Sequence, residues 1–305
     1  MFLTQEIIKT LAVPSLSRCL TGEIQDLRRL LILEKTPFPS PLLRAFLKRL
    51  SRDLDEGGGV FANLLARIGR LANPVARRRL IRNLFFHWGV RGASLRIRIR
   101  NSGKWVPFVV TMSPTMRCNL QCRGCYSGLY SKQGELSETE LDRLFTECKN
   151  MGDYFVVLTG GEPYLLKDSL LRLFRKHNDM YFLTFTNGTM LDEPLVDELA
   201  RLGNVAPALS LEGFEAETDR RRGAGVHARV LQSMDLLRSR GVLFGISVTY
   251  SSDNVDVLTD DRFIESMMER GVLFAWYFMF LPVGKDPVLE LVPTPEQRIR
   301  CGRRV

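Results

Sequence analysis

The sequence has few cysteines, no long apolar run and, over one long stretch, no acidic residue. Its 305 residues include six cysteines, too scattered for the disulfide framework of a small secreted protein. No apolar run reaches the roughly 18–20 residues that a membrane-spanning helix needs. Glu6 and Lys9 interrupt the N-terminal segment where a signal peptide would be apolar. We therefore expect a cytoplasmic protein in a reducing compartment.

Acidic residues are absent from residues 57–134, which hold 14 of the 43 lysines and arginines. The rest of the chain has 29 basic and 34 acidic residues and is therefore net acidic. The net charge of +9 thus comes from this block. A basic block of this length indicates either a solvated helix face or an anionic partner. The partner would be a phosphate-bearing substrate, nucleic acid or an acidic membrane surface, and both interpretations stay open.

The first 100 residues are predicted to form a basic, helical N-terminal region. Apolar residues recur at helical spacing over residues 39–50, and residues 74–89 combine arginines with an apolar side. A glycine-rich loop is expected at 55–60. Leucine and isoleucine alternate with arginine over 95–99, which predicts a strand that leads into a turn at 101–104.

From about residue 101 the pattern becomes strand and then helix, repeated six times over residues 101–285. Strands are predicted at 108–112, 154–159, 181–186, 206–211, 243–250 and 273–281. Between them lie helix-period segments, the first opened by a capping box of Ser137 and Glu140. This alternation indicates an α/β fold with a parallel sheet and right-handed crossovers. Six units favour a partial (β/α)6 barrel over a flat doubly wound sheet.

Polar or glycine-rich loops follow five of the six predicted strands. These loops are residues 118–128, 160–163, 186–189, 210–213 and 282–284. The carboxyl ends of parallel strands meet at one edge of a sheet or barrel. We therefore expect the five loops to converge on one face as an active site.

Three cysteines lie close together in the first of these loops, in the segment CNLQCRGCYSG. Cys118, Cys122 and Cys125 have the spacing Cys-x3-Cys-x2-Cys. No fourth cysteine or histidine stands at the spacing of a structural zinc site, and electron-carrying iron–sulfur proteins use four cysteines per cluster. Three thiolates would leave one iron of a four-iron cluster open, and an open position distinguishes catalytic metal sites from structural ones.

The remaining cysteines and the histidines carry no comparable signal. Cys148 continues the apolar stripe of a predicted helix and is expected to be a buried thiol rather than a ligand. Cys19 and Cys301 are isolated, and a single Cys301 is too little for an auxiliary cluster. His177 and His227 are interpreted as ordinary surface or core residues.

The cysteine loop, together with the Gly-Gly-Glu-Pro segment after the second strand, resembles the radical S-adenosylmethionine superfamily. The resemblance covers about residues 105–285. It implies that Cys118, Cys122 and Cys125 hold a four-iron, four-sulfur cluster whose open iron binds S-adenosylmethionine. It further implies reductive cleavage to methionine and a 5′-deoxyadenosyl radical, which takes hydrogen from an unreactive C–H bond. An external electron donor such as flavodoxin or ferredoxin is implied as a partner.

The same resemblance assigns cofactor contacts by position. The segment expected to hold the methionine group is Gly160, Gly161, Glu162 and Pro163. Its glycines would let the backbone approach the ligand without a Cβ in the way. Asn187 and Ser210 are candidates for the ribose or methionine ends.

Three further positions complete these assignments. Arg222 would pair with the methionine carboxylate, because guanidinium and carboxylate match bidentately, or would form a loop salt bridge instead. Pro282 and Gly284 would shape the adenine pocket. One departure stands out: many family members place an aromatic residue before the third cysteine, where this chain has Gly124 and has Tyr126 after the cysteine.

The motifs leave the substrate undefined. We expect a peptide or lipid-type substrate. A non-catalytic or regulatory iron–sulfur protein and a nucleic-acid-modifying enzyme are the alternatives. Nucleic acid is not favoured, since only the charge supports it and no RNA-binding module accompanies it. Residues 74–89 either dock on an anionic membrane, which would make the protein peripheral to it, or pack their apolar side on the barrel. Residues 286–305 are predicted to begin a C-terminal extension, unless this member lacks one.

Overall fold

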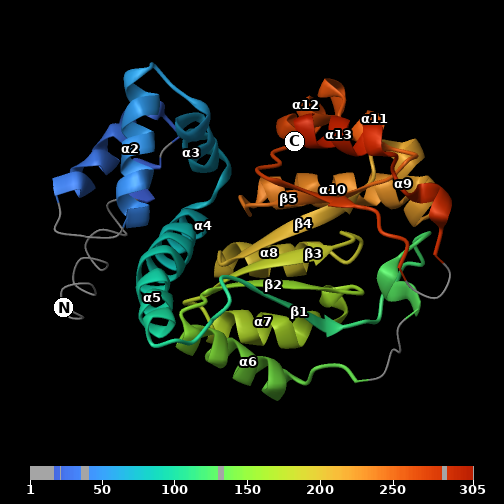
Figure 1. Ribbon diagram of the computed structural model, residues 1–305, viewed down its shortest axis with the longest axis horizontal. Helices are drawn as coiled ribbons and strands as arrows, with labels where there is room; N and C mark the ends of the chain where they lie inside the picture. The colour runs from blue at the N-terminus through green and yellow to red at the C-terminus, as the bar shows by residue number, and fades with distance from the viewer. Residues whose placement is uncertain (1–16, 21, 36–40, 130–133, 284–286, 305) are drawn as a thin grey trace.

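Six parallel strands form one sheet at the centre of the protein (Figure 1). The computed structural model describes residues 17–20, 22–35, 41–129, 134–283 and 287–304. The strands are β1 (Val110–Thr115), β2 (Phe155–Gly160), β3 (Tyr181–Thr186), β4 (Val205–Leu211), β5 (Gly245–Tyr250) and β6 (Ala275–Met279). They lie side by side in chain order, and each neighbouring pair is parallel. Over the described residues β1 and β6 do not pair, so the predicted α/β half-barrel is confirmed.

The sheet is curled rather than flat. The rings of Phe185 on β3 and Trp276 on β6 have centroids 5.9 Å apart, although β4 and β5 lie between them. In a flat sheet three strand spacings would separate these strands by about 14 Å. Phe185 pairs with Ala208, and Trp276 pairs with Ser247. These residues therefore point to the inside of the curve.

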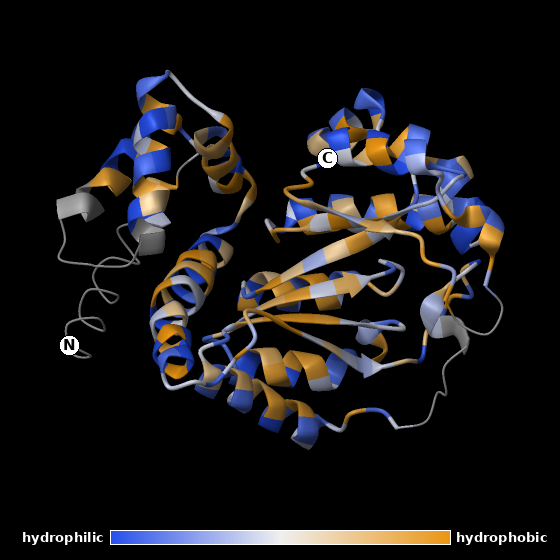
Figure 2. Cartoon of the chain, viewed as in Figure 1, coloured by the Kyte–Doolittle hydropathy of each residue, from blue (hydrophilic) through white to orange (hydrophobic). Residues whose placement is uncertain are grey.

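The larger core lies between the outer face of the sheet and the helices. The helices after β1 are α6 (Glu138–Met151), α7 (Lys167–Lys176), α8 (Glu193–Leu202), α9 (Glu215–Arg222), α10 (Val226–Ser239), α11 (Val255–Leu258) and α12 (Asp261–Glu269). Buried strand residues that pack against them include Val156, Leu158, Phe182, Leu209 and Val248. Figure 2 shows the strands as largely apolar, as burial on both faces of a parallel sheet requires. The predicted capping box is confirmed: the Ser137 hydroxyl accepts from Glu140 N–H and the Glu140 carboxylate accepts from Ser137 N–H.

A second, smaller core fills the inside of the barrel at the amino ends of the strands. Val157, Leu183 and Ala208 form its strand side. Leu80 and Leu84 pack against it from η2 (Leu80–Gly92), a π-helix in the N-terminal region. In Figure 1 this region stands at the left, where the strands begin. The apolar side of residues 74–89 therefore packs on the barrel, one of the two arrangements that the sequence predicts.

Helices make up the N-terminal region, as predicted. They are η1 (Ile24–Lys35), α2 (Pro41–Asp55), α3 (Val60–Leu71), α4 (Pro74–Arg79), η2 and α5 (Ala93–Asn101). Helices η1, α2 and α3 share a separate core with η2, in which Leu27, Leu47 and Leu50 are buried. The glycine-rich segment at 55–60 separates α2 from α3, which confirms the predicted loop.

The predicted strand over residues 95–99 is wrong, because these residues belong to α5. α5 continues directly from η2, and extending an existing helix costs less than starting one. Arg96 supports it: its guanidinium donates to the Trp88 carbonyl at 3.2 Å and lies 5.5 Å from the Trp88 ring centroid. In a strand, the backbone N–H and C=O groups of these residues would also have needed hydrogen-bond partners on a neighbouring strand. The turn expected at 101–104 is present at the helix end, where Gly103 N–H donates to the Arg100 carbonyl.

Several arginines in and just before η2 form hydrogen bonds to other parts of the chain. Arg79 and Arg82 donate to the Asn178 carbonyl at 2.8 and 2.7 Å, and the buried Asn83 amide donates to it at 2.9 Å. Arg77 donates to the Leu20 carbonyl at 2.6 Å. Much of the basic block therefore holds the N-terminal helices to the barrel and to one another.

The last described segment packs on the barrel through η5 (Leu289–Leu291) and α13 (Pro295–Arg304). Leu291 and Cys301 are buried, and burial raises the pKa of the Cys301 thiol. Cys19 is buried in the N-terminal core. Burial also raises the pKa of the Cys148 thiol on α6 to about 12, which confirms a structural thiol there. Among the helices described, none is long and apolar enough to cross a membrane.

Candidate functional site

The predicted loops meet at the carboxyl edge of the sheet, on the right of Figure 1. The cysteine loop leaves β1 and is tied to the loop after β2. Gly161 N–H donates to the Thr115 carbonyl at 2.9 Å, and Glu162 N–H donates to the Arg117 carbonyl at 2.8 Å. On its other side, Arg123 N–H donates to the Arg221 carbonyl of α9 at 2.8 Å. Backbone hydrogen bonds to the loop after β2 and to α9 thus hold the cysteine loop in place.

The three cysteines of this loop form no disulfide and are half-buried. Burial raises the pKa of the Cys122 thiol, Arg222 opposes this, and the charges of Cys118 and Cys125 raise it further. Cys118 Sγ accepts from Leu120 N–H at 3.4 Å and faces the Asn187 amide at 3.7 Å. Three thiols thus share one electrostatic environment next to hydrogen-bond donors that stabilise thiolates.

This donor set fits an iron–sulfur cluster better than a single ion. Within the described ranges, no three side chains among histidine, cysteine, aspartate and glutamate converge as closely as one ion requires. Each thiolate of a four-iron cluster binds a different iron, so the ligands stand farther apart than around one ion. Three soft thiolates without a carboxylate or imidazole are also typical of iron–sulfur ligation.

Gly160 and Gly161 are required for the packing of two loops. Gly160 has a φ of +118°, and a Cβ there would collide with the Thr115 carbonyl oxygen. A Cβ at Gly161 would collide with the carbonyl oxygen of Arg117, next to Cys118. The reason expected for these glycines, room for the methionine group, is therefore incomplete. They first let the backbone of the cysteine loop come close.

Glu162 connects the loops after β2 and β3. Its buried carboxylate accepts from Tyr164 N–H at 3.1 Å, the Thr186 hydroxyl at 2.8 Å and Asn187 N–H at 2.8 Å. Burial raises its pKa to about 6, and these hydrogen bonds oppose the shift. Pro163 follows as the first residue of η4 (Pro163–Leu166) and is buried. Three of the roughly four acceptor positions of this carboxylate are thus taken by the protein.

Asn187 lies against the cysteine loop. Its amide donates to the Asn119 side chain at 2.8 Å and faces Cys118 Sγ. Its carbonyl oxygen accepts from Thr189 N–H at 2.9 Å. Asn187 is only 6% exposed. The structure therefore places it next to Cys118.

Arg222 forms a buried ion pair with Glu212, the salt bridge that was its alternative assignment. Arg222 Nε donates to the Glu212 carboxylate at 2.9 Å, and Arg221 donates to the same oxygen. The Nη1 atom of Arg222 lies 4.0 Å from Cys122 Sγ. Burial lowers the pKa of Arg222, but Glu212 and the thiols of Cys122 and Cys125 outweigh it, so the pKa is raised. Arg222 thus lies between Glu212 and Cys122.

Glu212 is the residue of this network that the sequence reasoning did not assign. Glu212→Gln would leave two buried guanidinium groups without their carboxylate, and such losses cost about 3–5 kcal/mol. Glu198→Gln is the matched control, because Glu198 also pairs with two arginines, Arg175 and Arg201, at the surface. Exposed pairs contribute about 1 kcal/mol or less. Urea unfolding of the parent and both variants measures the difference, and equal losses would contradict a buried role for Glu212.

The remaining predicted contacts lie at the same edge. Ser210 is half-buried and pairs in register with Ser247, so both point to the inside of the barrel. Pro282 is half-buried directly after β6. Gly284 lies outside the described residues. The Tyr126 hydroxyl donates to the Gly160 carbonyl at 3.3 Å.

The departure at Gly124 has a structural cause. Gly124 has a φ of +66°, and a Cβ there would lie 2.7 Å from the ring of Phe280. Phe280 is buried just after β6. Its ring occupies the space that a side chain at position 124 would take.

An aromatic wall lines the inside of the barrel and was also missed from the sequence. It consists of Phe185, Trp276 and Phe278, of which the last two are each 41% exposed. The rings of Trp276 and Phe278 are stacked, 6.1 Å apart at an angle of 13°. The signal was present in LFAWYFMFL, where Phe274, Trp276, Phe278 and Phe280 alternate along one face.

Comparisons with known proteins agree with this geometry. The family model of the radical SAM superfamily matches residues 112–269. An AdoMet-dependent heme synthase of Methanosarcina barkeri is 30% identical over 200 residues, 63% of this chain and 56% of that protein. A PqqA peptide cyclase of Granulibacter bethesdensis is 28% identical over 193 residues, 60% of this chain and 50% of that protein. The chain thus spans about half the length of these curated relatives.

A solved structure shows the same fold. SuiB of Streptococcus suis bound to S-adenosylmethionine aligns with a TM-score of 0.59 at 16% identity, over 70% of this chain and 51% of that one. The matched residues 112–269 contain all three loop cysteines and are about half of the chain. The chain therefore belongs to the radical SAM superfamily of enzymes, whose cofactors are a four-iron, four-sulfur cluster and S-adenosylmethionine.

Proposed function

We propose that this enzyme abstracts hydrogen from a substrate that presents an aromatic or planar apolar group, with a peptide as the first candidate. The single observation that carries the proposal is the aromatic wall of Phe185, Trp276 and Phe278. Large aromatic side chains exposed inside a barrel lose water when a ring packs on them. Such a surface favours flat substrates over flexible polar ones.

The position of the aromatic wall supports this role. Below it, Phe274 packs with the base of the barrel that η2 closes. Above it, Phe280 contacts Gly124 of the cysteine loop. The exposed rings of Trp276 and Phe278 thus lie between a closed base and the cluster loop. A ring held there would be near the site of chemistry and shielded from bulk water.

The chain's own residues would then hold the cofactors and position the loops. When bound, the cluster and S-adenosylmethionine supply the 5′-deoxyadenosyl radical. Cys118, Cys122 and Cys125 would ligate three irons. We further propose cofactor contacts for six of the groups predicted from the sequence: Gly160, Gly161, Pro163, Asn187, Ser210 and Pro282. Because Glu162 and Arg222 are engaged with protein partners, their part would be to position neighbouring loops.

Two substrate classes are compatible with a flat aromatic surface. A peptide is supported by the similarity to a PqqA peptide cyclase, and a tetrapyrrole by the similarity to an AdoMet-dependent heme synthase. The stacked pair of Trp276 and Phe278 is the specific feature that favours the tetrapyrrole as second candidate. A lipid substrate and peripheral contact with an anionic membrane rest on the basic block alone, since the apolar side of η2 packs on the barrel. An external donor such as flavodoxin or ferredoxin would supply the electron.

Replacement of Trp276 by alanine tests the aromatic wall. Losing one stacking ring costs on the order of 1.4 kcal/mol, which is roughly tenfold in affinity. We expect Trp276→Ala to raise the KM for an active tyrosine- or tryptophan-containing peptide or coproporphyrin by about this factor. S-adenosylmethionine cleavage without substrate should not change. The measurement is 5′-deoxyadenosine formed by the reduced, reconstituted enzyme at varied substrate concentration.

Trp105→Ala is the control, because Trp105 is 86% exposed and lies before β1. Equal KM values for parent and Trp276→Ala would contradict substrate contact with the aromatic wall. If the reduced parent forms no 5′-deoxyadenosine with or without candidates, the catalytic proposal fails and a regulatory iron–sulfur protein takes its place.

A further inference from the structure

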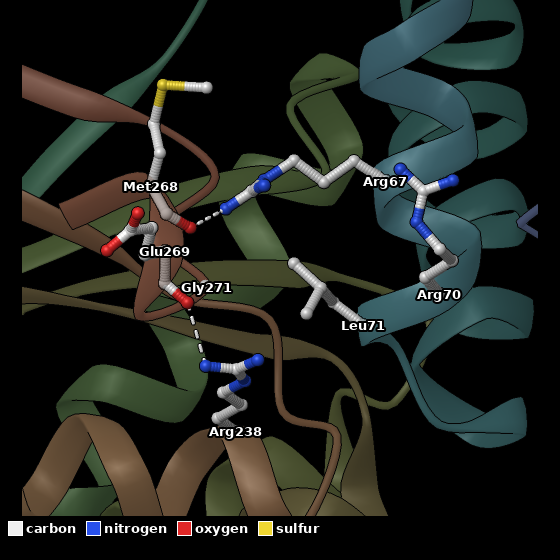
Figure 3. A pocket seen from close by; sticks show the side chains of 7 residues that line it. All are labelled: Arg67, Arg70, Leu71, Arg238, Met268, Glu269 and Gly271. Carbon is white, nitrogen blue, oxygen red and sulfur yellow. Dashed lines mark hydrogen bonds between the residues drawn. The ribbon is translucent and has the colours of Figure 1, made fainter. Parts of the chain in front are cut away.

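A cavity of about 420 Å³ lies far from the cysteine loop, between α3 and the helices that precede β5 and β6. Its lining contains three arginines: Arg67 and Arg70 from α3, and Arg238 from the end of α10. Figure 3 shows Arg67 and Leu71 projecting from α3 toward Met268 and Gly271, which Arg238 approaches from α10. Because α10 and α12 end where β5 and β6 begin, this cavity is at the opposite end of the barrel from the cluster loop.

The three guanidinium groups have no carboxylate partner among the described residues. Arg67 donates to the Met268 carbonyl, Arg70 to the Gly22 carbonyl at 2.7 Å and Arg238 to the Glu269 carbonyl at 2.7 Å. Glu269 lines the cavity, but Figure 3 shows its carboxylate turned away from Arg67 and Arg238. Arg67 and Arg238 therefore bring two cations to a cavity lined by a single carboxylate, whereas Figure 3 shows the Arg70 guanidinium beside α3, turned away from both.

Most donors of these arginines remain available. A guanidinium carries five N–H groups, and the hydrogen bonds of the three described above use only a few of them. The Nε of Arg67 is buried and has no partner among the residues described. Burial lowers the pKa of Arg67, and the charges of Arg70 and Arg238 lower it further. An oxyanion in the cavity would relieve this repulsion and accept hydrogen bonds from the free N–H groups.

A structural explanation covers part of this arrangement. Met268 and Glu269 lie at the end of α12, and cations there stabilise the exposed carbonyls of a helix end. That role accounts for one bond each from Arg67 and Arg238. Arg70 is held by the Gly22 carbonyl instead, but neither role accounts for the buried Nε of Arg67 or for a cavity of this size.

We propose that this cavity binds a small organic phosphate, with the phosphate group on Arg67 and Arg238 and an apolar part on Leu71. Guanidinium groups pair with phosphate oxygens through two parallel hydrogen bonds. The volume is in the range of small-molecule sites, about 300–1,000 Å³, and exceeds what a bare phosphate needs. Since the lining combines α3 with α10 and α12, the ligand would connect the N-terminal helices to the base of the barrel.

Phenyl phosphate tests the proposal, because it joins one phosphate to one apolar ring and lacks the adenine that the active site binds. Calorimetric titration uses the reconstituted enzyme saturated with S-adenosylmethionine. We expect phenyl phosphate to bind more tightly than inorganic phosphate, and phenol not to bind. Arg67→Gln and Arg238→Gln should each weaken phenyl phosphate binding by about tenfold or more. Arg298→Gln removes the same charge from exposed α13 and should leave binding unchanged.

Three results would overturn the proposal. The first is that the parent binds neither phenyl phosphate nor inorganic phosphate. The second is that Arg298→Gln weakens binding as much as Arg238→Gln, which would show general charge attraction. The third is that only vesicles of phosphatidylcholine with phosphatidic acid bind, in an Arg67- and Arg238-dependent manner, which would assign the arginines to a membrane surface.

Discussion

Replacement of Cys118, Cys122 or Cys125 by alanine is expected to abolish the brown chromophore of the anaerobically reconstituted protein and all cleavage of S-adenosylmethionine. Each thiolate would hold a different iron, and the described structure places no other cysteine in the cysteine loop that could take its place. Loss of one ligand leaves an incomplete thiolate set for a cluster that already relies on three. Iron and sulfide quantification, absorbance and 5′-deoxyadenosine formation measure the loss.

Cys148→Ala is the matched control. Cys148 is buried on α6 and packs in the main core, and burial keeps its thiol protonated at neutral pH. The variant should lose some stability, as core substitutions do, yet retain the cluster and the cleavage reaction. A Cys148→Ala protein without cluster beside a Cys122→Ala protein with one would refute the ligand assignment.

The half-barrel could be predicted from the sequence because its signals are local. Each strand is a short β-branched or aromatic run, and each helix between strands has the apolar period of a helix that covers a sheet. The capping box of Ser137 and Glu140 even marks the start of α6. In contrast, residues 95–99 have the two-residue alternation of a strand but continue the helix before them. There the preceding helix decided the outcome, and no local pattern shows that.

Within the site, the cysteines and the Gly-Gly-Glu-Pro segment could be found from their spacing, whereas their partners could not. The Arg222–Glu212 pair joins residues ten positions apart. The contact between Gly124 and Phe280 joins the first and last strands of the sheet, and Phe185 meets Trp276 only because the sheet curls. Such contacts depend on closure of the barrel, which has no signature in a short segment. The alternating aromatics of β6 were visible, but which face they occupy was not.

Gly161→Ala is expected to have the second large effect, and it separates two explanations of the same glycine. A Cβ at position 161 would collide with the carbonyl oxygens of Arg117 and Met116, which are backbone atoms and cannot yield as a flexible side chain can. Overpacking of this kind costs about 1–3 kcal/mol. Since Arg117 precedes Cys118, the displaced segment is the cysteine loop itself. We expect cluster occupancy after reconstitution to fall by roughly tenfold or more, which corresponds to about 1.4 kcal/mol or above.

The sequence alone predicts a different result, in which a side chain at 161 spares the cluster and weakens only S-adenosylmethionine binding. Iron and sulfide content measures the first outcome, and the shift of the electron paramagnetic resonance spectrum on addition of S-adenosylmethionine measures the second. Gly302→Ala on α13 is the control, because a Cβ there meets no atom within 4 Å. A Gly161→Ala protein with full cluster content and a lost spectral shift would show that the glycine serves the methionine group. Loss of cluster with an intact Gly302→Ala protein would show that it first serves the approach of two loops, on which the position of all three cysteines depends.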